Sequence, residues 1–137
     1  MSNSGSFFGW LITLGFLLTL SNYPVKAIYR SYISHLPTQS KSKRIYMRVQ
    51  KFLVANHRYF ALFTTVMLVL HILIQLLYRW FSWTGFVAAL LMVANGFIGA
   101  YGHYVKKKRK SAWLIIHRLT AVLLILTIIA HLVSKGR

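Results

Sequence analysis

Four long apolar stretches, separated by polar segments, dominate this chain. They cover residues 7–23, 52–78, 84–104 and 112–133. A helix crosses the hydrocarbon core of a bilayer with about 20 apolar residues, and the first stretch, although short, is sufficient if its helix is tilted. The pattern therefore predicts an all-α integral membrane four-helix bundle, a single transmembrane domain over residues 1–137 in contact with membrane lipids.

The segment before the second span, residues 24–51, is polar and strongly basic. Its cations are Lys26, Arg30, Lys41, Lys43, Arg44, Arg48 and Lys51. Pro37 and its polar neighbours predict a turn. From Arg44 onward the apolar residues fit either an amphipathic helix at the membrane interface or a run-in to the second span. The first span lacks the basic start and the cleavage site of a signal peptide, so we expect it to be retained.

The composition agrees with a membrane protein and excludes several classes of site. The sequence is 57% hydrophobic and 12% charged, contains no Asp, Glu or Cys, and carries a net charge of +17. Without Cys it has no disulfides, iron–sulfur clusters or covalently attached c-type haem. Without carboxylates it has no catalytic acid pairs and no calcium or magnesium sites built from side chains.

The positive charge by itself could suggest nucleic acid as a partner. The cations, however, lie between apolar stretches rather than along a module that fits a nucleic-acid groove, so we expect no nucleic-acid partner. Anionic lipid headgroups, and the carboxylates of a cofactor, are the expected partners instead.

The distribution of Lys and Arg predicts the orientation in the membrane. Seven lie in the segment after the first span and five in residues 106–110, against one, Arg79, after the second span and two at the C-terminus. Basic loops stay on the cytoplasmic side, so both termini are expected outside, in a bacterial cytoplasmic membrane. Aromatic residues are expected to mark the interfaces, Trp10, Trp80 and Trp83 outside and Tyr101, Tyr104 and Trp113 inside.

Two histidine pairs share one spacing. His57 and His71 lie fourteen positions apart in the second stretch, and His117 and His131 have the same separation in the fourth. Fourteen steps nearly complete four helical turns, so both members of a pair face the same way, about 21 Å apart along the helix axis. The second and fourth spans run in the same direction. If they face each other, His57 and His117 share an inner, cytoplasmic level, and His71 and His131 share an outer level.

Each of these levels offers two imidazoles and no sulfur or carboxylate, which is a poor donor set for zinc. Haem iron already has four pyrrole nitrogens and needs only two axial ligands, so the four histidines suit two haem b groups with low-spin iron. The alternative is that each histidine hydrogen-bonds to a neighbouring helix. Because histidine inside a membrane is costly without a function and the two spacings are equal, the pattern favours haem.

Arginines near the histidines are candidates for binding the haem propionates. Arg58 and Arg118 directly follow the inner histidines, and Arg79 closes the second span near the outer level. The alternative for each arginine is a lipid headgroup. His103, at the inner end of the third span, is expected to contact water or a headgroup, with a propionate or a quinone as alternatives. His35, in the basic segment, is expected to be solvated.

The third span carries Gly96, Gly99 and Gly102. Small residues at this spacing clear one helix face, either for close helix packing or for a flat macrocycle. The basic residues 106–110 that follow are most simply a topology signal, with docking of an acidic partner as the alternative.

The stretch Trp113-Leu-Ile-Ile-His-Arg-Leu-Thr, continuing to His131, resembles the second ligand helix of ferric-reductase-like transmembrane domains. The segment from His57 to His71 is similar to the first ligand helix of that superfamily, which includes the membrane parts of NADPH oxidases and the haem subunit of bacterial methionine sulfoxide reductase systems. The resemblance covers residues 52–133 and implies two ligand helices, one intervening span and two b haems. The chain departs from the family in having four spans and no flavin or nicotinamide domain; other dihaem membrane cytochromes b are alternative relatives.

We therefore expect a dihaem b-type cytochrome that carries electrons across the membrane. The expected donor is a quinol or a cytoplasmic flavoprotein, and the expected acceptor is extracytoplasmic, with the chain serving as one subunit of a larger redox complex. Two other functions stay open: a haem-free accessory or assembly subunit, and a small transporter with a histidine proton relay.

Overall fold

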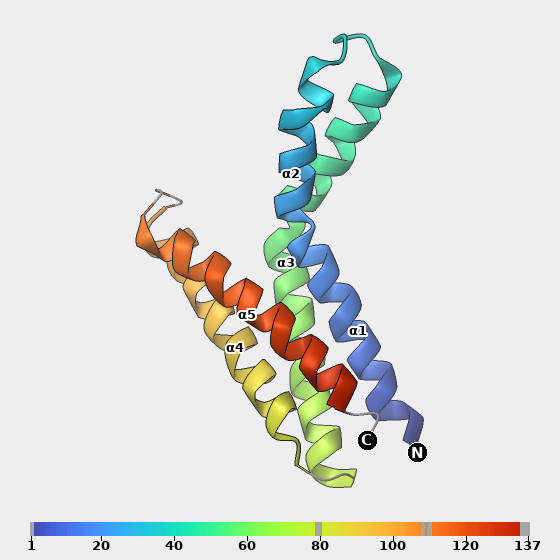
Figure 1. The fold of residues 1–137 in the computed structure, drawn as a ribbon, viewed down its shortest axis with the longest axis vertical. Coiled ribbons are helices and arrows are strands. Elements are labelled where there is room, and N and C mark those ends of the chain that lie inside the picture. The colour runs from blue at the N-terminus through green and yellow to red at the C-terminus, as the bar shows by residue number, and fades with distance from the viewer. Residues whose placement is uncertain (1, 79–80, 108, 110, 135–137) are drawn as a thin grey trace. The chain divides into compact units, whose positions relative to one another are not determined.

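The computed structural model describes residues 2–78, 81–107, 109 and 111–134, and these residues form helices and turns without a strand (Figure 1). The elements are α1 (Ser2–Leu20), α2 (Asn22–Ser31), the 3-10 helix η1 (Ile33–His35), α3 (Lys41–Tyr78), α4 (Trp83–Ala100), the π-helix η2 (Tyr101–Val105) and α5 (Ala112–Ser134). The prediction of an all-α chain is confirmed. The helices belong to two compact units, residues 1–74 and residues 75–137.

Four helical segments are long and apolar enough to cross a membrane, as the sequence predicts. They are Ser6–His35, Lys41–Tyr78, Trp83–Val105 and Ala112–Ser134. Many of their large apolar side chains are exposed, including Leu90, Phe97 and Leu126 at 60%, 71% and 59%. Lipid is the solvent that suits such a surface, so these helices belong in a membrane and contact its lipids.

The first apolar stretch continues as helix beyond its expected end at residue 23. Ser21 joins α1 to α2: its amide donates to the carbonyl of Leu17 at 2.9 Å, and its carbonyl accepts from the amide of Val25 at 3.1 Å. Pro24 falls in the first turn of α2, where the missing N–H removes no intrahelical hydrogen bond. The proline therefore does not stop the helix, which runs on to Ser31.

Residues 24–51, expected as a connector, are largely helical as well. α3 begins at Lys41 and continues without a break to Tyr78. Residues 41–78 contain neither glycine nor proline, the two residues that most often interrupt a helix. Of the two alternatives for the residues after Arg44, the structure contains the run-in to the second span.

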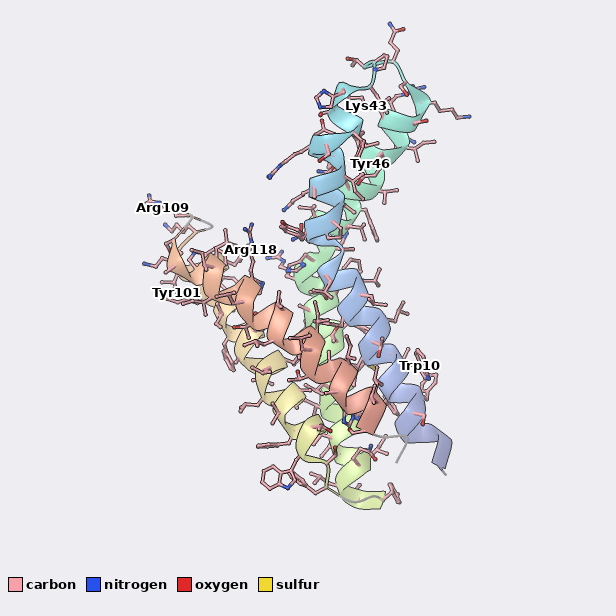
Figure 2. The ribbon with its side chains drawn as sticks, viewed as in Figure 1. Trp10, Lys43, Tyr46, Tyr101, Arg109 and Arg118 are labelled. Atoms are coloured by element: carbon pink, nitrogen blue, oxygen red, sulfur yellow. The ribbon has the colours of Figure 1, made fainter. Side chains whose placement is uncertain are left out.

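A helical hairpin of α2 and the start of α3 is held together by hydrogen bonds from α3 side chains (Figure 2). Lys43 Nζ donates to two carbonyls near the turn, those of Ser34 at 3.0 Å and Leu36 at 2.7 Å. One turn further along α3, the hydroxyl of Tyr46 donates to the carbonyl of Val25 at 2.9 Å. The two bonds from Lys43 satisfy carbonyls beyond the end of α2, whereas the bond from Tyr46 ties α3 to the first half of α2.

α1 packs closely on α3 at Gly15. A Cβ at this position would overlap Oγ1 of Thr64 and stand 3.0 Å from Cδ1 of Phe63. Thr64 is buried, and its hydroxyl donates to the carbonyl of Phe60 at 2.7 Å, within its own helix. Because that polar group is satisfied locally, the glycine backbone can approach it without leaving a buried donor unpaired.

In the second unit α4 and α5 lie side by side in opposite directions (Figure 1). Their connected end is closed by Trp113, whose ring lies over buried Gly102 and would overlap a Cβ there. The indole Nε1 of Trp113 also donates to the carbonyl of Arg109 at 2.8 Å. Further along α5, Leu124 is almost completely buried at 1% exposure. These contacts make the pair a close-packed hairpin.

Candidate functional site

His57, on α3, hydrogen-bonds to the end of α1. Its Nδ1 lies 2.9 Å from the carbonyl oxygen of Thr19. Because a carbonyl only accepts hydrogen bonds, Nδ1 carries the proton and the lone pair is on Nε2, the atom through which this tautomer could bind a metal. Thr19 lies in the last turn of α1, so this bond joins α3 to the end of α1. The end of α1 therefore fixes the tautomer of His57.

His71, four turns further along α3, lies against the same helix. A Cβ built on Gly9 of α1 would stand 3.8 Å from Cε1 of His71, an ordinary van der Waals distance. Both histidines of the first pair thus face α1, as their spacing along one helix predicts.

His117, on α5, is held by the facing turn of α4. Its Nδ1 lies 3.2 Å from the carbonyl oxygen of Asn95. Here too the acceptor is a backbone carbonyl, so Nδ1 carries the proton and the lone pair is on Nε2. One turn along α4, a Cβ on Gly99 would stand 3.2 Å from Cε1 of the ring, closer than ordinary contact.

His131, near the end of α5, is surrounded by hydroxyl groups. Its Nδ1 lies 3.1 Å from Oγ1 of Thr84 and 3.4 Å from Oγ of Ser82. Thr84 also lies within hydrogen-bonding distance of both serine hydroxyls, Ser82 at 3.1 Å and Ser134 at 3.2 Å. A Cβ on Gly85 would stand 3.0 Å from Cε1 of His131. Both histidines of the second pair therefore face α4.

The four imidazoles form a donor set that suits haem. Metal-bound histidines usually donate their second ring N–H to an oxygen, which fixes the tautomer and the orientation of the ring. Such an oxygen lies at Nδ1 of His57, His117 and His131. Within the described residues no three side chains of the types His, Cys, Asp and Glu gather into one group. A haem iron would need one nitrogen from each of two histidines.

The predicted couples join residues of different units. His57 and His71 belong to residues 1–74, and His117 and His131 belong to residues 75–137. The structure brings each histidine against a helix of its own unit, α1 or α4. The coupling across units, His57 with His117 and His71 with His131, stays a prediction.

Two of the three arginines predicted to bind propionates lie within the described residues. Arg58 is exposed; its guanidinium lies 5.0 Å from the centre of the Tyr59 ring and donates to the tyrosine hydroxyl at 3.2 Å. Arg118 is also exposed, on α5 (Figure 2). Arg79 lies outside the described residues, as does Trp80. The two arginines next to the inner histidines are therefore placed at the surface of their helices.

The two remaining histidines occupy different positions. His35 is exposed at the end of η1. His103 is half-buried in the π-helix η2, where its ring packs edge-on against that of Tyr104 at 4.7 Å between centroids. The exposed position of His35 agrees with its expected solvation. His103 contacts an aromatic ring, and its expected contact with water or a headgroup stays a prediction.

A groove of about 620 Å³ lies beside the connected end of α4 and α5. Its lining includes the aromatic residues Phe97 of α4, Tyr101 of η2 and Trp113 of α5, together with Lys106. The Trp113 ring centroid stands 6.4 Å from that of His117. The groove therefore adjoins the inner histidine of α5.

No family model matches this sequence, and no curated protein or solved structure is significantly similar to it. The resemblance to ferric-reductase-like domains accordingly stays a prediction. The function proposed below therefore rests on the residues of this chain and their contacts.

Several residues around the histidines have no sequence signal that identifies them. The acceptors at Thr19 and Asn95 are backbone carbonyls, which every residue offers, so only the fold reveals them. Gly85 and Gly99 do carry a signal: they have the same separation along the chain as the two histidines they contact.

Proposed function

We propose that this protein is a dihaem b-type membrane cytochrome that carries electrons across the membrane. The four axial ligands would be His57, His71, His117 and His131. The observation that carries the proposal is the oxygen at Nδ1 of His57, His117 and His131, which is a backbone carbonyl in the first two. This is the usual outer partner of a metal-bound imidazole, and it leaves Nε2 as the ligand atom.

The chain's own residues have separate tasks in this function. The imidazoles would bind the iron through Nε2, the oxygens of α1 and α4 would hold the tautomers of His57, His117 and His131, and the apolar helices would exclude water. Arg58, Arg118 and Arg79 pair with propionates, and the sequence contains no carboxylate to compete for them. Haem, when bound, supplies one-electron oxidation and reduction at its iron. Two levels about 21 Å apart along the helices would span most of the hydrocarbon core.

The direction of transfer follows from the proposed orientation. With the basic segments inside, both termini lie outside and the inner level faces the cytoplasm. The donor would be a quinol or a cytoplasmic flavoprotein, and the acceptor would be extracytoplasmic, within a larger redox complex. The aromatic groove next to His117 supports a quinol, because a flat ring bound there would lie close to the inner level.

The test is the haem content of the purified full-length protein from haem-replete cells. A pyridine haemochrome assay should give two b haems per chain, with a low-spin visible spectrum. Each of the variants His57→Ala, His71→Ala, His117→Ala and His131→Ala should lose one haem. His35→Ala is the matched control, because that ring is exposed at the end of η1, and it should keep both haems. A stable but colourless wild-type preparation would contradict the proposal.

A second candidate function has support from the same hydrogen bonds. His57 and His117 each join two helices through a carbonyl, which a haem-free accessory or assembly subunit would use purely for helix packing. In that case the purified protein lacks haem, and each histidine variant is less stable than the wild type. A transporter with a histidine proton relay would also lack haem, but its variants would lose proton-coupled transport.

A further inference from the structure

Two glycines of α4 lie directly against the two histidines of α5. A Cβ on Gly99 would stand 3.2 Å from Cε1 of His117, and a Cβ on Gly85 would stand 3.0 Å from Cε1 of His131. Ordinary van der Waals contact of a Cβ begins at about 3.4 Å, so a methyl group at either position would push the ring. Because the helices are antiparallel and the glycines are spaced as the histidines are, the two contacts repeat in register.

Each of these rings has a second contact with the same helix. Nδ1 of His117 bonds to the carbonyl of Asn95, and Nδ1 of His131 bonds to Oγ1 of Thr84. A single hydrogen bond leaves a ring free to tilt about the bond. The α4 backbone at Gly99 and Gly85 lies on the Cε1 side of the ring, where even an added Cβ would stand only 3.2 or 3.0 Å from Cε1, and so limits that tilt. Together the two contacts define the plane of the imidazole and the direction of Nε2.

A glycine does not lie close to a histidine ring merely because it has no side chain. Gly96 lies on the same helix, yet a Cβ there would have nothing within 4 Å. In α1, a Cβ on Gly9 would stand 3.8 Å from Cε1 of His71, so a methyl group fits there. Among these glycines, the close approach to a histidine is confined to Gly85 and Gly99, the two positions that face α5.

We propose that Gly85 and Gly99 are positioning residues that set the planes of the axial imidazoles of His131 and His117. This inference rests on the proposed function, because the ring plane matters when Nε2 binds iron. The angle between two axial imidazole planes affects the electronic structure and the reduction potential of a bis-histidine haem. α4 would thus tune both haems without supplying a ligand to either.

The experiment compares three alanine variants of the full-length haem-loaded protein: Gly99→Ala, Gly85→Ala and the control Gly96→Ala. All three substitutions raise helix propensity alike, so differences between them report the contact with histidine. The readouts are haem content, the low-spin EPR signals, which report the angle between axial imidazole planes, and a potentiometric titration of each haem.

Gly99→Ala should shift the EPR signal and the potential of one haem, and Gly85→Ala should shift those of the other haem. The expected change in the reduction equilibrium constant is about threefold, or ~30 mV for a one-electron couple. Gly96→Ala should leave both haems as in the wild type. Gly9→Ala is a further variant with space for the methyl group, and it should fold and show a smaller shift than Gly85→Ala.

Three outcomes are distinguishable. A wild type without haem overturns the proposed function and this inference with it. A haem-containing wild type with Gly99→Ala and Gly85→Ala signals identical to those of Gly96→Ala overturns the positioning role alone. Equal shifts of both haems in either variant also overturn it, because they would indicate a general loosening of the helices. If Gly99→Ala fails to fold, the comparison of Gly85→Ala with Gly96→Ala decides by the same criteria.

Discussion

In the α1–α3 pair, His57 bonds to a carbonyl in the last turn of α1, and His71 has an ordinary contact with Gly9. In the α4–α5 pair, both histidines have an oxygen at Nδ1 and a glycine on the Cε1 side, where an added Cβ would stand only 3.2 or 3.0 Å from Cε1. Both pairs have the same histidine spacing, but the partner helices α1 and α4 make different contacts with them. The comparison indicates that α4 holds the orientation of its histidines, whereas α1 is built chiefly to pack on α3.

The close packing of α1 is concentrated at Gly15, between the levels of His57 and His71. There the glycine meets a buried threonine, Thr64, and the ring of Phe63. In the second unit the tightest glycine contact is at the connected end of the pair, where Trp113 covers Gly102. The two units therefore place their most constrained packing at different distances from the histidines.

The largest expected effect is on stability, from Gly15→Ala. The added methyl group would overlap buried Thr64, and overpacking of this kind costs about 1–3 kcal/mol. Gly102→Ala should cost less, because the Trp113 side chain at the end of the hairpin can swing away. Thermal unfolding in detergent, followed by circular dichroism, measures both. Gly96→Ala, which meets open space, is the control and should not lower the midpoint. An equal loss in Gly15→Ala and Gly96→Ala would show that α1 is not closely packed there.

The second prediction concerns the hydroxyl group next to His131. Thr84→Val removes the nearer of two hydroxyl oxygens at Nδ1; with Nδ1 as the donor to it, its loss makes the imidazole a weaker donor to iron and favours the reduced state. The reduction equilibrium constant of one haem should increase by a factor of about 3 to 10. This corresponds to a rise in its reduction potential of ~30 to 60 mV. A potentiometric titration of the two haems measures the shift.

The matched control for this prediction is Thr120→Val, also a part-buried threonine. The Thr120 hydroxyl bonds to the carbonyl of Ile116 in its own helix at 2.9 Å, so its removal should move neither potential. A shift of both haems in Thr84→Val, or the same shift in the control, would show that Thr84 has no specific link to His131.

The smallest expected effect is in the hairpin of α2 and α3, away from every histidine of the two pairs. Tyr46→Phe removes the hydrogen bond to the carbonyl of Val25 and should lower stability by about 0.5–1 kcal/mol. Both haems and both potentials should stay unchanged. Thermal unfolding and the haem assay on the same preparation check the two statements. Loss of haem from this variant would mean that the hairpin contributes to the ligand helices more directly than its contacts indicate.

Much of the fold was predictable from the sequence, because long apolar stretches in a chain without acidic residues have few structural solutions other than membrane helices. The helical continuation through Pro24 was not, since the effect of a proline depends on its distance from the start of the next helix. The hairpin of α2 and α3 depends on bonds from Lys43 and Tyr46 to distant carbonyls, and such bonds leave no periodic pattern.

The candidate site divides in the same way. The spacing within each pair predicts that its two histidines share a helix face. In the structure the first pair faces α1 and the second pair faces α4. The carbonyls of Thr19 and Asn95 could not be predicted, because a backbone acceptor is independent of residue type. The glycines at 85 and 99 share the separation of His117 and His131, but their alignment with His131 and His117 required the antiparallel register of α4 and α5.

The most direct test of the central claim is the haem content of two double variants with the same number of histidines removed. His57→Ala with His117→Ala removes both ligands of one proposed level, and His57→Ala with His131→Ala removes one ligand from each level. If His57 pairs with His117 and His71 with His131, the first variant should hold one haem per chain and the second none, against two in the wild type. Equal haem content in the two double variants, or no haem in the wild type, would contradict the account.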